Sequence, residues 1–202
     1  MKIALKLVLL LVIIGLGYMV VESIMEPVRF NKEKDKREQT VIRKLEDIRS
    51  AELAYRKLNG SYTASWDTLI DFLKNNEFFI VKEVADPNDT TFTKTIRDTL
   101  GTISIIDSLY NERINFHVDH LKYVPIPAKY FNNEEFELRS GKIERGGVPV
   151  YVFESQATYE VLLKGLDEQL IRNLNKSVVE MNKYPGLKVG SLSEASTEGN
   201  WK

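Results

Sequence analysis

Hydrophobic positions along the first 60 residues change from a continuous run to a helical stripe. Leu7 to Val21 is fifteen residues without a charge, and the apolar stretch reaches nineteen residues when counted from Ile3 across Lys6. At about 1.5 Å per residue, this length is close to the thickness of the hydrocarbon core of a bilayer. The pattern predicts a membrane anchor within residues 1–26, with the Lys6 side chain reaching back to the headgroups.

A cleaved signal peptide is the alternative interpretation of the same segment. Lys2 and Lys6 give it a basic start, and its apolar core is short enough for a signal sequence. However, the residues around Val21 and Ser23 lack the small-residue pattern of a signal peptidase site. We therefore expect an uncleaved anchor.

Residues 27–59 are predicted to form a long amphipathic helix. Pro27 is able to start or kink it, and the alternating charges of Asn31 to Gln39 indicate a solvated stem. Lys44 is expected on the exposed face, and Asn59-Gly60 ends the helix. The apolar stripe that follows the stem has steps of three and four residues: Val41, Leu45, Ile48, Ala51, Tyr55 and Leu58.

Residues 60–190 are predicted to form a soluble α+β domain. Ser65 caps a second short helix, Gly146-Gly147 turns a hairpin, and Leu162 to Met181 favours a helix in its second half. Residues 191–202 are small and polar and are expected to form a flexible tail. Five β-rich runs are predicted as strands: Phe78 to Val84, Thr102 to Ile106, Leu121 to Ile126, Phe136 to Ile143 and Val148 to Phe153.

Composition narrows the classes of function. The chain has 202 residues, 28 Lys and Arg against 29 Asp and Glu, and a net charge of -1, which disfavours nucleic-acid binding. It has no cysteine, which excludes disulfides, thiolate zinc sites and cysteine nucleophiles. It also lacks a Gly-x-Ser-x-Gly motif and glycine-rich phosphate loops. We therefore expect no catalytic residues and no cofactor.

Two segments are weak candidates for metal binding. The only two histidines, His117 and His120, flank Asp119, but on a strand His117 and Asp119 would share a face and His120 would point away. Ordinary surface histidines are therefore the favoured interpretation. The second segment holds Asp86, Asn88 and Asp89 and lacks the glycine and distal glutamate of an EF-hand, so an Asx turn is favoured.

The first 75 residues or so resemble the type IV pilin and type II secretion pseudopilin superfamily. Gly15 and Pro27 are similar to the isoleucine-glycine step and the proline of the pilin membrane helix. The second part of the resemblance is an aromatic-flanked Asn-Gly turn with a following leucine: Tyr55, Asn59, Gly60, Tyr62 and Leu69. The resemblance implies a long anchored helix packed on a small antiparallel sheet, and some pseudopilins bind calcium through acidic loops.

The sequence departs from this family at the processing site. Gly17-Tyr18 followed by Glu22 mimics the spacing of prepilin cleavage, but cutting there would discard the apolar segment. When the chain is aligned on Gly15, Lys6 occupies the position of the family's glutamate. The usual prepilin cleavage site is therefore absent.

These features together predict a non-enzymatic single-pass protein, a structural or assembly component of a secretion, pilus-like or other cell-envelope complex. The resemblance implies an inner-membrane location with the domain in the periplasm or outside. The expected partners are the bilayer and other membrane-anchored or pilin-like subunits, further copies of this chain included. A membrane-tethered ligand-binding or enzymatic domain is the alternative.

Overall fold

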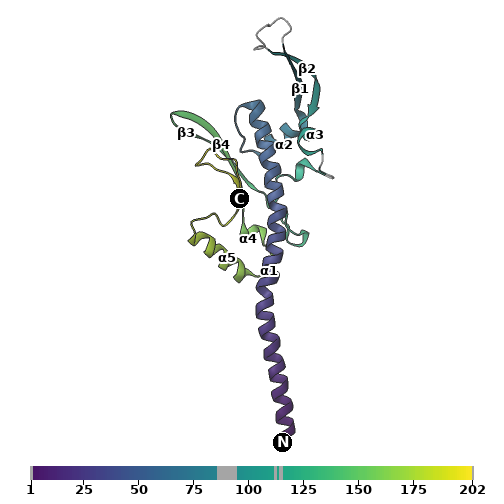
Figure 1. Ribbon diagram of the computed structural model, residues 1–202, viewed down its shortest axis with the longest axis vertical. Coiled ribbons are helices and arrows are strands. Elements are labelled where there is room, and N and C mark those ends of the chain that lie inside the picture. The colour runs from purple at the N-terminus through teal and green to yellow at the C-terminus, as the bar shows by residue number, and fades with distance from the viewer. Residues whose placement is uncertain (1, 86–94, 112, 114–115, 202) are drawn as a thin grey trace. The chain divides into compact units, whose positions relative to one another are not determined.

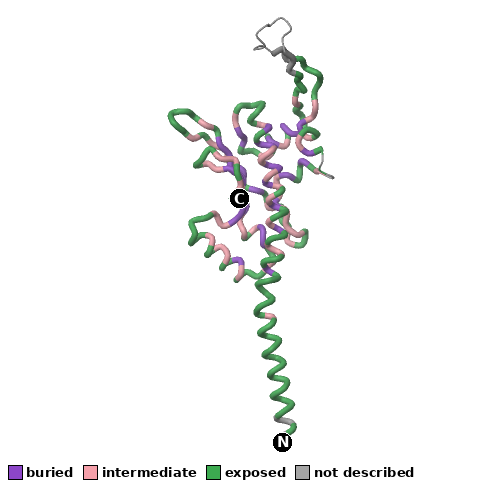
Figure 2. The backbone as a smooth tube through the Cα atoms, viewed as in Figure 1, coloured by how far each residue is buried: buried purple, intermediate pink, exposed green. Residues whose placement is uncertain are grey.

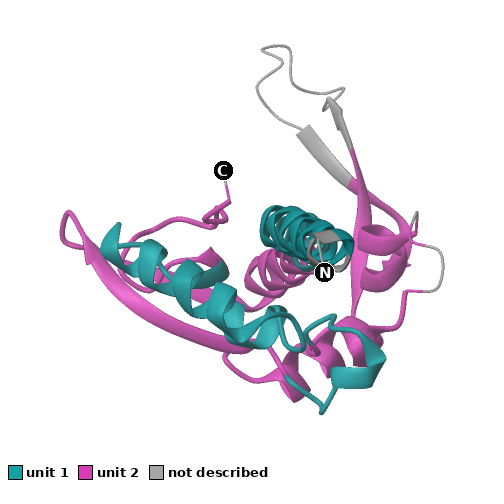
Figure 3. Ribbon diagram, turned by 90° about the horizontal axis from the view of Figure 1, so that it is seen from below, with its two compact units in different colours: residues 1–42, 124–134, 157–187 teal, residues 43–123, 135–156, 188–202 magenta. Residues whose placement is uncertain are grey.

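The computed structural model describes residues 2–85, 95–111, 113 and 116–201 of the chain. Its longest element is helix α1 (Lys2–Asn59), which is followed by helix α2 (Trp66–Asn75) and by a set of short strands and helices (Figure 1). The strands form antiparallel pairs, so the predicted α+β class is confirmed. The chain divides into two compact units, and α1 contributes to both (Figure 3).

Helix α1 continues without interruption through Pro27. An interior proline removes one backbone hydrogen bond but has a φ angle compatible with the helix, and the helix extends on both sides of Pro27. The predicted boundary at residues 26 and 27 therefore lies inside one helix, and the side-chain environment changes only at Phe30, the first buried residue. Figure 2 shows this change, with an exposed N-terminal half and increasing burial beyond it.

Unit 1 comprises residues 1–42, 124–134 and 157–187. Besides the first part of α1 it holds the 3-10 turn η2 (Ala128–Tyr130) and the helices α4 (Tyr159–Leu162) and α5 (Glu168–Glu180). Asp167 caps α5 by accepting a hydrogen bond from the Leu170 amide at 2.8 Å. The helix predicted in the second half of the segment Leu162 to Met181 is thus confirmed.

The charged stretch of α1 in unit 1 is partly buried, which corrects the expectation of a solvated stem. Arg37 is only 8% exposed, and its guanidinium donates to the carbonyl oxygens of Leu162 at 3.2 Å and Lys164 at 3.0 Å. It also pairs with Glu33 at 3.0 Å. The alternation of charges predicted exposure because isolated charges are costly to bury. Arg37 is buried nonetheless, because its guanidinium has enough donors to bind several acceptors at once.

Unit 2 comprises residues 43–123, 135–156 and 188–202. Strands β1 (Glu77–Ala85) and β2 (Thr95–Ser104) form a two-stranded antiparallel sheet. Strands β3 (Glu137–Arg145), β4 (Val148–Thr158) and β5 (Gly186–Gly190) form a three-stranded sheet in the order β3-β4-β5, mostly within unit 2. Gly146 and Gly147 have φ angles of 60° and 79°, as a two-residue hairpin turn requires, so the predicted hairpin is confirmed.

Two of the predicted strands differ from the structure. The run from Thr102 stops at Ser104, because the Ser104 hydroxyl accepts the Asp107 amide at 3.0 Å and starts helix α3 (Ile105–Tyr110). The run Leu121 to Ile126 is not a strand; it follows the 3-10 turn η1 (Val118–His120) and forms one isolated bridge, Tyr123 with Glu135. Local capping and turn hydrogen bonds override β-propensity at both places.

The segment from Ser191, where the sequence indicated a flexible tail, returns along β5. The Gly190 amide donates to the Glu198 carbonyl at 3.0 Å, and the Asn200 amide donates to the Lys188 carbonyl at 3.1 Å. Trp201 lies over Gly199, where an added Cβ would be 2.3 Å from the indole ring. Backbone pairing and this ring contact account for the tryptophan near the end of the chain.

The predicted stripe on α1 forms part of the core. Val41, Leu45, Ile48 and Ala51 are all fully buried, which confirms that this face of the helix is covered. The stripe does not stay buried to its end, because Tyr55 is half-buried and Leu58 is 46% exposed. Lys44, expected on the exposed face, is instead half-buried, and its ammonium donates to the Tyr123 carbonyl at 2.6 Å. Its long side chain lets it satisfy a loop carbonyl from beside the apolar stripe.

The buried stripe predicts unequal effects of alanine substitutions along α1. Leu45→Ala or Ile48→Ala removes a fully buried side chain and should lower the free energy of unfolding by about 2–5 kcal/mol. Arg43→Ala, on an exposed position of the same helix, should change it by no more than about 0.5 kcal/mol. Denaturant unfolding of the full chain in detergent micelles measures both; equal losses at Leu45 and Arg43 would contradict the packing.

Candidate functional site

The most extensive surface feature is the exposed apolar half of α1. Ile3 and the apolar side chains from Leu7 to Val28 are exposed, with Leu7 and Val21 each at 58%. Lys6 is also exposed. By length and composition α1 is able to cross a membrane, since an 18-residue window has a mean hydropathy of 2.5 and none of it is buried. The helix is compatible with a single-pass transmembrane anchor.

Glu22, just beyond the apolar run, forms an ion pair with Arg29. The Arg29 guanidinium lies 2.8 Å from the Glu22 carboxylate, two helical turns away. Both side chains remain substantially exposed, at 63% and 41%. The pair offsets the charge of Glu22 close to the end of the apolar stretch, where an unpaired carboxylate is costly in a lipid environment.

The residues of the Asn-Gly turn meet at the C-terminal end of α1. The side-chain amide of Asn59 donates to the Tyr55 carbonyl at 3.0 Å, and the Tyr55 ring makes an edge contact with Phe72, with centroids 5.0 Å apart. Gly60 has a φ of 77°, and its amide donates to the Arg56 carbonyl at 2.8 Å. These contacts end the helix and turn the chain toward α2.

Tyr62 and Leu69 extend this cluster into the core. The Tyr62 hydroxyl accepts a hydrogen bond from Arg56 at 3.0 Å, and its ring lies 4.8 Å from that of Phe153 on β4. Tyr62 thus links the end of α1 to the three-stranded sheet, and Leu69 is fully buried. Gly15, in contrast, has open space where a Cβ would be placed, so the fold itself does not require this glycine.

Glu52 is an unusual group that the sequence reasoning missed. It is fully buried, its Oε2 accepts the Thr63 amide at 3.1 Å, and its Oε1 has no hydrogen-bond partner. Burial raises the pKa of this carboxyl to about 8, although the Thr63 hydrogen bond acts in the opposite direction. Glu52 follows Ile48 by four residues, so it lies on the same face of the helix as the apolar stripe. This spacing was the sequence signal that could have predicted its burial.

A second buried polar group lies one turn away on α1. The Asp47 carboxylate accepts from Arg113 at 2.6 Å, and the Asp47 carbonyl accepts from the Tyr110 hydroxyl at 2.8 Å. Burial raises the pKa of Asp47 to about 6, with the Arg113 charge opposing this shift. Burial also lowers the pKa of Lys44 to about 8. These interactions hold α3 and the chain after it on α1.

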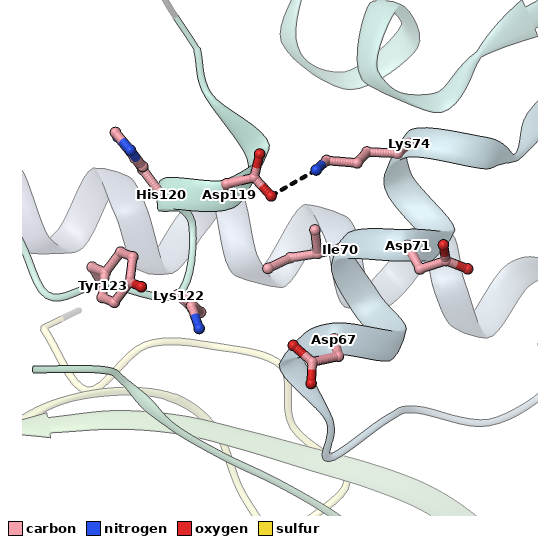
Figure 4. A pocket seen from close by; sticks show the side chains of 8 residues that line it. All are labelled: Asp67, Ile70, Asp71, Lys74, Asp119, His120, Lys122 and Tyr123. Atoms are coloured by element: carbon pink, nitrogen blue, oxygen red, sulfur yellow. Dashed lines mark hydrogen bonds and ion pairs between the residues drawn. The ribbon is translucent and has the colours of Figure 1, made fainter. Parts of the chain in front are cut away.

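The histidine segment forms one wall of an open cleft of about 490 Å³ in unit 2. His117 precedes the turn η1 and His120 is its last residue, with ring centroids 5.5 Å apart. Asp119 does not join them, because its carboxylate binds Lys74 at 2.6 Å, and this hydrogen bond lowers the pKa of Asp119. Figure 4 shows the Lys74–Asp119 pair and His120 turned away from it.

The cleft is lined mostly by polar side chains that form ion pairs or hydrogen bonds with protein groups. Lys122 pairs with Glu135 at 2.7 Å, and Asp71 accepts from Asn75 at 2.6 Å. Across the described part of the chain, no three His, Asp or Glu side chains are grouped so that they could hold a metal ion. The other candidate set, Asp86, Asn88 and Asp89, lies outside the described residues.

Comparison of the chain with protein-family models, curated proteins and solved structures finds no match. The architecture of α1 remains a basis for an interpretation of function.

Glu52 is expected to make the stability of the fold depend on pH. Its pKa is about 8 in the folded protein and about 4.3 when unfolded. Its stabilising contribution is therefore complete below the unfolded pKa and is lost as pH rises through 8. Glu52→Gln, which cannot ionise, should raise the free energy of unfolding at pH 8–9 by on the order of 2–5 kcal/mol relative to the parent.

Unfolding of the full chain between pH 5 and 9 tests this expectation. The advantage of Glu52→Gln should shrink toward pH 5, where the parent carboxyl is already neutral in the folded state. Taking the difference between the two proteins removes the contributions of Asp47 and Lys44, which both retain. Glu77→Gln, on an exposed residue, is the matched control. Parallel stability curves for parent and Glu52→Gln would rule out a buried, titrating Glu52.

Proposed function

We propose that this protein is a non-enzymatic, single-pass membrane protein with a pilin-like domain. It acts as a structural or assembly component of a cell-envelope complex. The anchor lies in the cytoplasmic membrane and the domain lies in the periplasm or outside the cell. Its partners are the lipid bilayer and other membrane-anchored subunits, further copies of this chain included.

The division of α1 into two halves is the observation that carries this proposal. From Leu7 to Val21 the helix exposes a continuous apolar surface, whereas beyond Phe30 Val41, Leu45 and Ile48 are fully buried. A soluble domain does not gain stability from the exposed half, because large exposed apolar surfaces are unfavourable in water. A lipid environment accounts for the exposed half, and the same helix continues into the folded part of the chain.

The end of α1 supports the pilin-like part of the proposal. Tyr55, Asn59 and Gly60 form the helix end, and Tyr62 connects it to β4 through Phe153. A long helix joined in this way to an antiparallel sheet is the arrangement that the resemblance implies. The ionisable groups of the polar cleft at Asp119 are mostly paired with one another, which favours a structural role over a catalytic one.

A tethered ligand-binding or enzymatic domain would require different properties of the membrane segment of α1 than an assembly component does. A tether needs only apolar length, whereas an assembly component needs a particular face of the helix for its neighbours. Transmembrane helices associate through close packing of specific side chains rather than through hydrophobicity alone. The two functions therefore differ in their sensitivity to the sequence of the anchor.

Replacement of Leu7 to Val21 by an equal run of leucines distinguishes them. The replacement should preserve insertion, measured as resistance to carbonate extraction. Because the chain has no cysteine, single cysteines introduced along the segment report neighbours by crosslinking in intact membranes. In the natural anchor we expect crosslinks that recur every three to four residues, and the leucine run should abolish that pattern. Weak crosslinking without periodicity in both proteins would favour the tether.

Lys6 provides a separate prediction about the anchor. Its exposed ammonium is expected to reach the headgroups rather than a protein partner. Lys6→Gln should therefore leave both carbonate resistance and the crosslinking pattern nearly unchanged. If Lys6→Gln abolished a crosslinked oligomer while the protein remained inserted, Lys6 would be a subunit-pairing residue.

A further inference from the structure

The ribbon formed by β1 and β2 carries four exposed apolar side chains in unit 2. The two strands make a sheet of their own and pair only with each other among the described strands. Phe79 is 70% exposed, Leu100 63%, and Ile80 and Val81 44% each. Figure 2 shows most of the described ribbon as exposed. A two-stranded ribbon is marginally stable in water until a further strand or another surface packs on it.

The free edges of the two strands differ in regularity. Ile80 pairs with Gly101 and Val81 pairs with Thr99, so Leu100 is an extra residue on β2. A bulge of this kind bends a strand and is one way in which proteins prevent further pairing at an edge. β1 has no extra residue in this register. Its free edge is therefore the one suited to accept another strand.

The sequence of β1 is unusual for an edge strand. Phe78 to Val81 is a continuous apolar run, a pattern typical of strands in the interior of a sheet. Edge strands in soluble proteins are usually protected by charged side chains. β3, at the edge of the three-stranded sheet, has Arg139, Lys142 and Arg145. β1 thus combines an edge position with the side chains of an interior strand.

The residues from Glu77 to Lys82 are complementary to a second copy of themselves. They read Glu-Phe-Phe-Ile-Val-Lys, with an acid at one end, a base at the other and four apolar residues between. One antiparallel register of two copies matches every position: Glu77 with Lys82, Phe78 with Val81, and Phe79 with Ile80. Opposite charges and aromatic residues facing β-branched ones are stabilising cross-strand pairs.

Neighbouring registers lack this match. A slip of one residue places Lys82 opposite Phe78 in one direction, and Glu77 opposite Val81 in the other. Because a slip also turns every side chain to the other face, the pattern specifies a single register. Glu77 and Lys82 are both exposed, and neither takes part in an ion pair among the described residues. Both charges are therefore available to a second copy.

From these observations we propose that β1 docks antiparallel on β1 of a second copy of this chain. The product is a continuous four-stranded sheet, β2-β1-β1-β2, with a two-fold axis at its centre. Six residues a side are far fewer than the roughly 20–30 of a standard interface, so the pairing is weak in solution and gains from copies held close together. The inference rests on the proposed assembly function for its biological role, whereas the pairing itself needs no anchor.

Charge reversal in the full-length protein tests the pairing. Dimerisation is measured by sedimentation equilibrium in detergent micelles, which let two copies approach in either orientation. Glu77→Lys or Lys82→Glu places like charges opposite each other at both ends of the interface and should raise the dissociation constant roughly tenfold. The double variant Glu77→Lys/Lys82→Glu should regain the parent value, because it exchanges the charges and keeps their complementarity. An equimolar mixture of the two single variants should associate for the same reason.

The controls separate this interface from association through the anchor. Glu144→Lys reverses an exposed charge on β3 and should behave as the parent does. Association through the membrane helix would not respond to any of these charges, so equal dissociation constants for the parent and both single variants would overturn the proposal. A double variant as weak as the single ones would also overturn it. Carbonate extraction is scored in parallel, so failure here is distinguishable from failure of the proposed anchoring.

Introduced cysteines test the register, since the natural chain has none. Directly opposed residues of antiparallel strands have Cα atoms about 4.5–5.5 Å apart, within the range of a disulfide. A mixture of Phe79→Cys and Ile80→Cys proteins should therefore form mixed disulfides. Each variant alone should form few, because like positions of the two copies lie on opposite faces of the sheet.

Val148→Cys, on an exposed apolar residue of β4, is the control for random collision. Thermal melting verifies that all three cysteine variants remain folded. Mixed disulfides no more frequent than those of Val148→Cys would contradict the proposed docking. Crosslinks from Phe79→Cys and Ile80→Cys that join other proteins of the membrane instead of this chain would identify a different partner and refute the second copy.

Discussion

The fold depends on α1 remaining one helix while its side chains serve two environments. Up to Val28 the helix exposes apolar side chains, and from Phe30 onward one face is covered by protein. A helix satisfies its backbone hydrogen bonds internally, so it is among the few elements able to continue from lipid into a folded domain. Any break between residues 25 and 35 would uncouple the anchor from the domain, which is why continuity through Pro27 matters.

Polar side chains of α1 hold the surrounding loops by binding their backbone. In unit 1, Arg37 donates to the carbonyls of Leu162 and Lys164. In unit 2, Lys44 donates to the Tyr123 carbonyl and Glu52 accepts the Thr63 amide. Loops buried against a helix need such partners, because an unpaired backbone group removed from water costs as much as a lost hydrogen bond. The helix therefore determines where irregular segments lie as well as where the apolar core lies.

Burying these polar groups lowers the stability of the fold relative to apolar residues at the same positions, because each group loses its hydration. Glu52 has one oxygen without a partner, and its raised pKa shows that the site favours the neutral carboxylic acid. Asp47 is in a similar position but has Arg113 as a compensating cation. Polar groups of this kind specify one arrangement of loops more strictly than a purely apolar stripe does. This strictness fits a protein proposed to present a defined surface to neighbouring subunits.

The sequence by itself determined the elements whose signals are local. The apolar run predicted the exposed half of α1, the stripe from Val41 predicted its buried face, and Gly146-Gly147 predicted the β3–β4 hairpin. Each depends on the period of a helix or on the φ angles of a turn, which neighbouring residues fix. The same holds for the end of α1 at Gly60 and for the cap at Ser65.

Only the tertiary structure decided which polar residues are buried and what they bind. Arg37 and Lys44 looked like solvated charges, yet each binds carbonyls that are far away in the sequence. The tail after Ser191 pairs with β5, and residues 121–126 form no strand despite their β-propensity. Tyr130 and Glu160, which are 30 residues apart in the sequence, line the same cleft in unit 1. Such contacts depend on long-range packing, and the periodicity of hydrophobic positions carries no information about them.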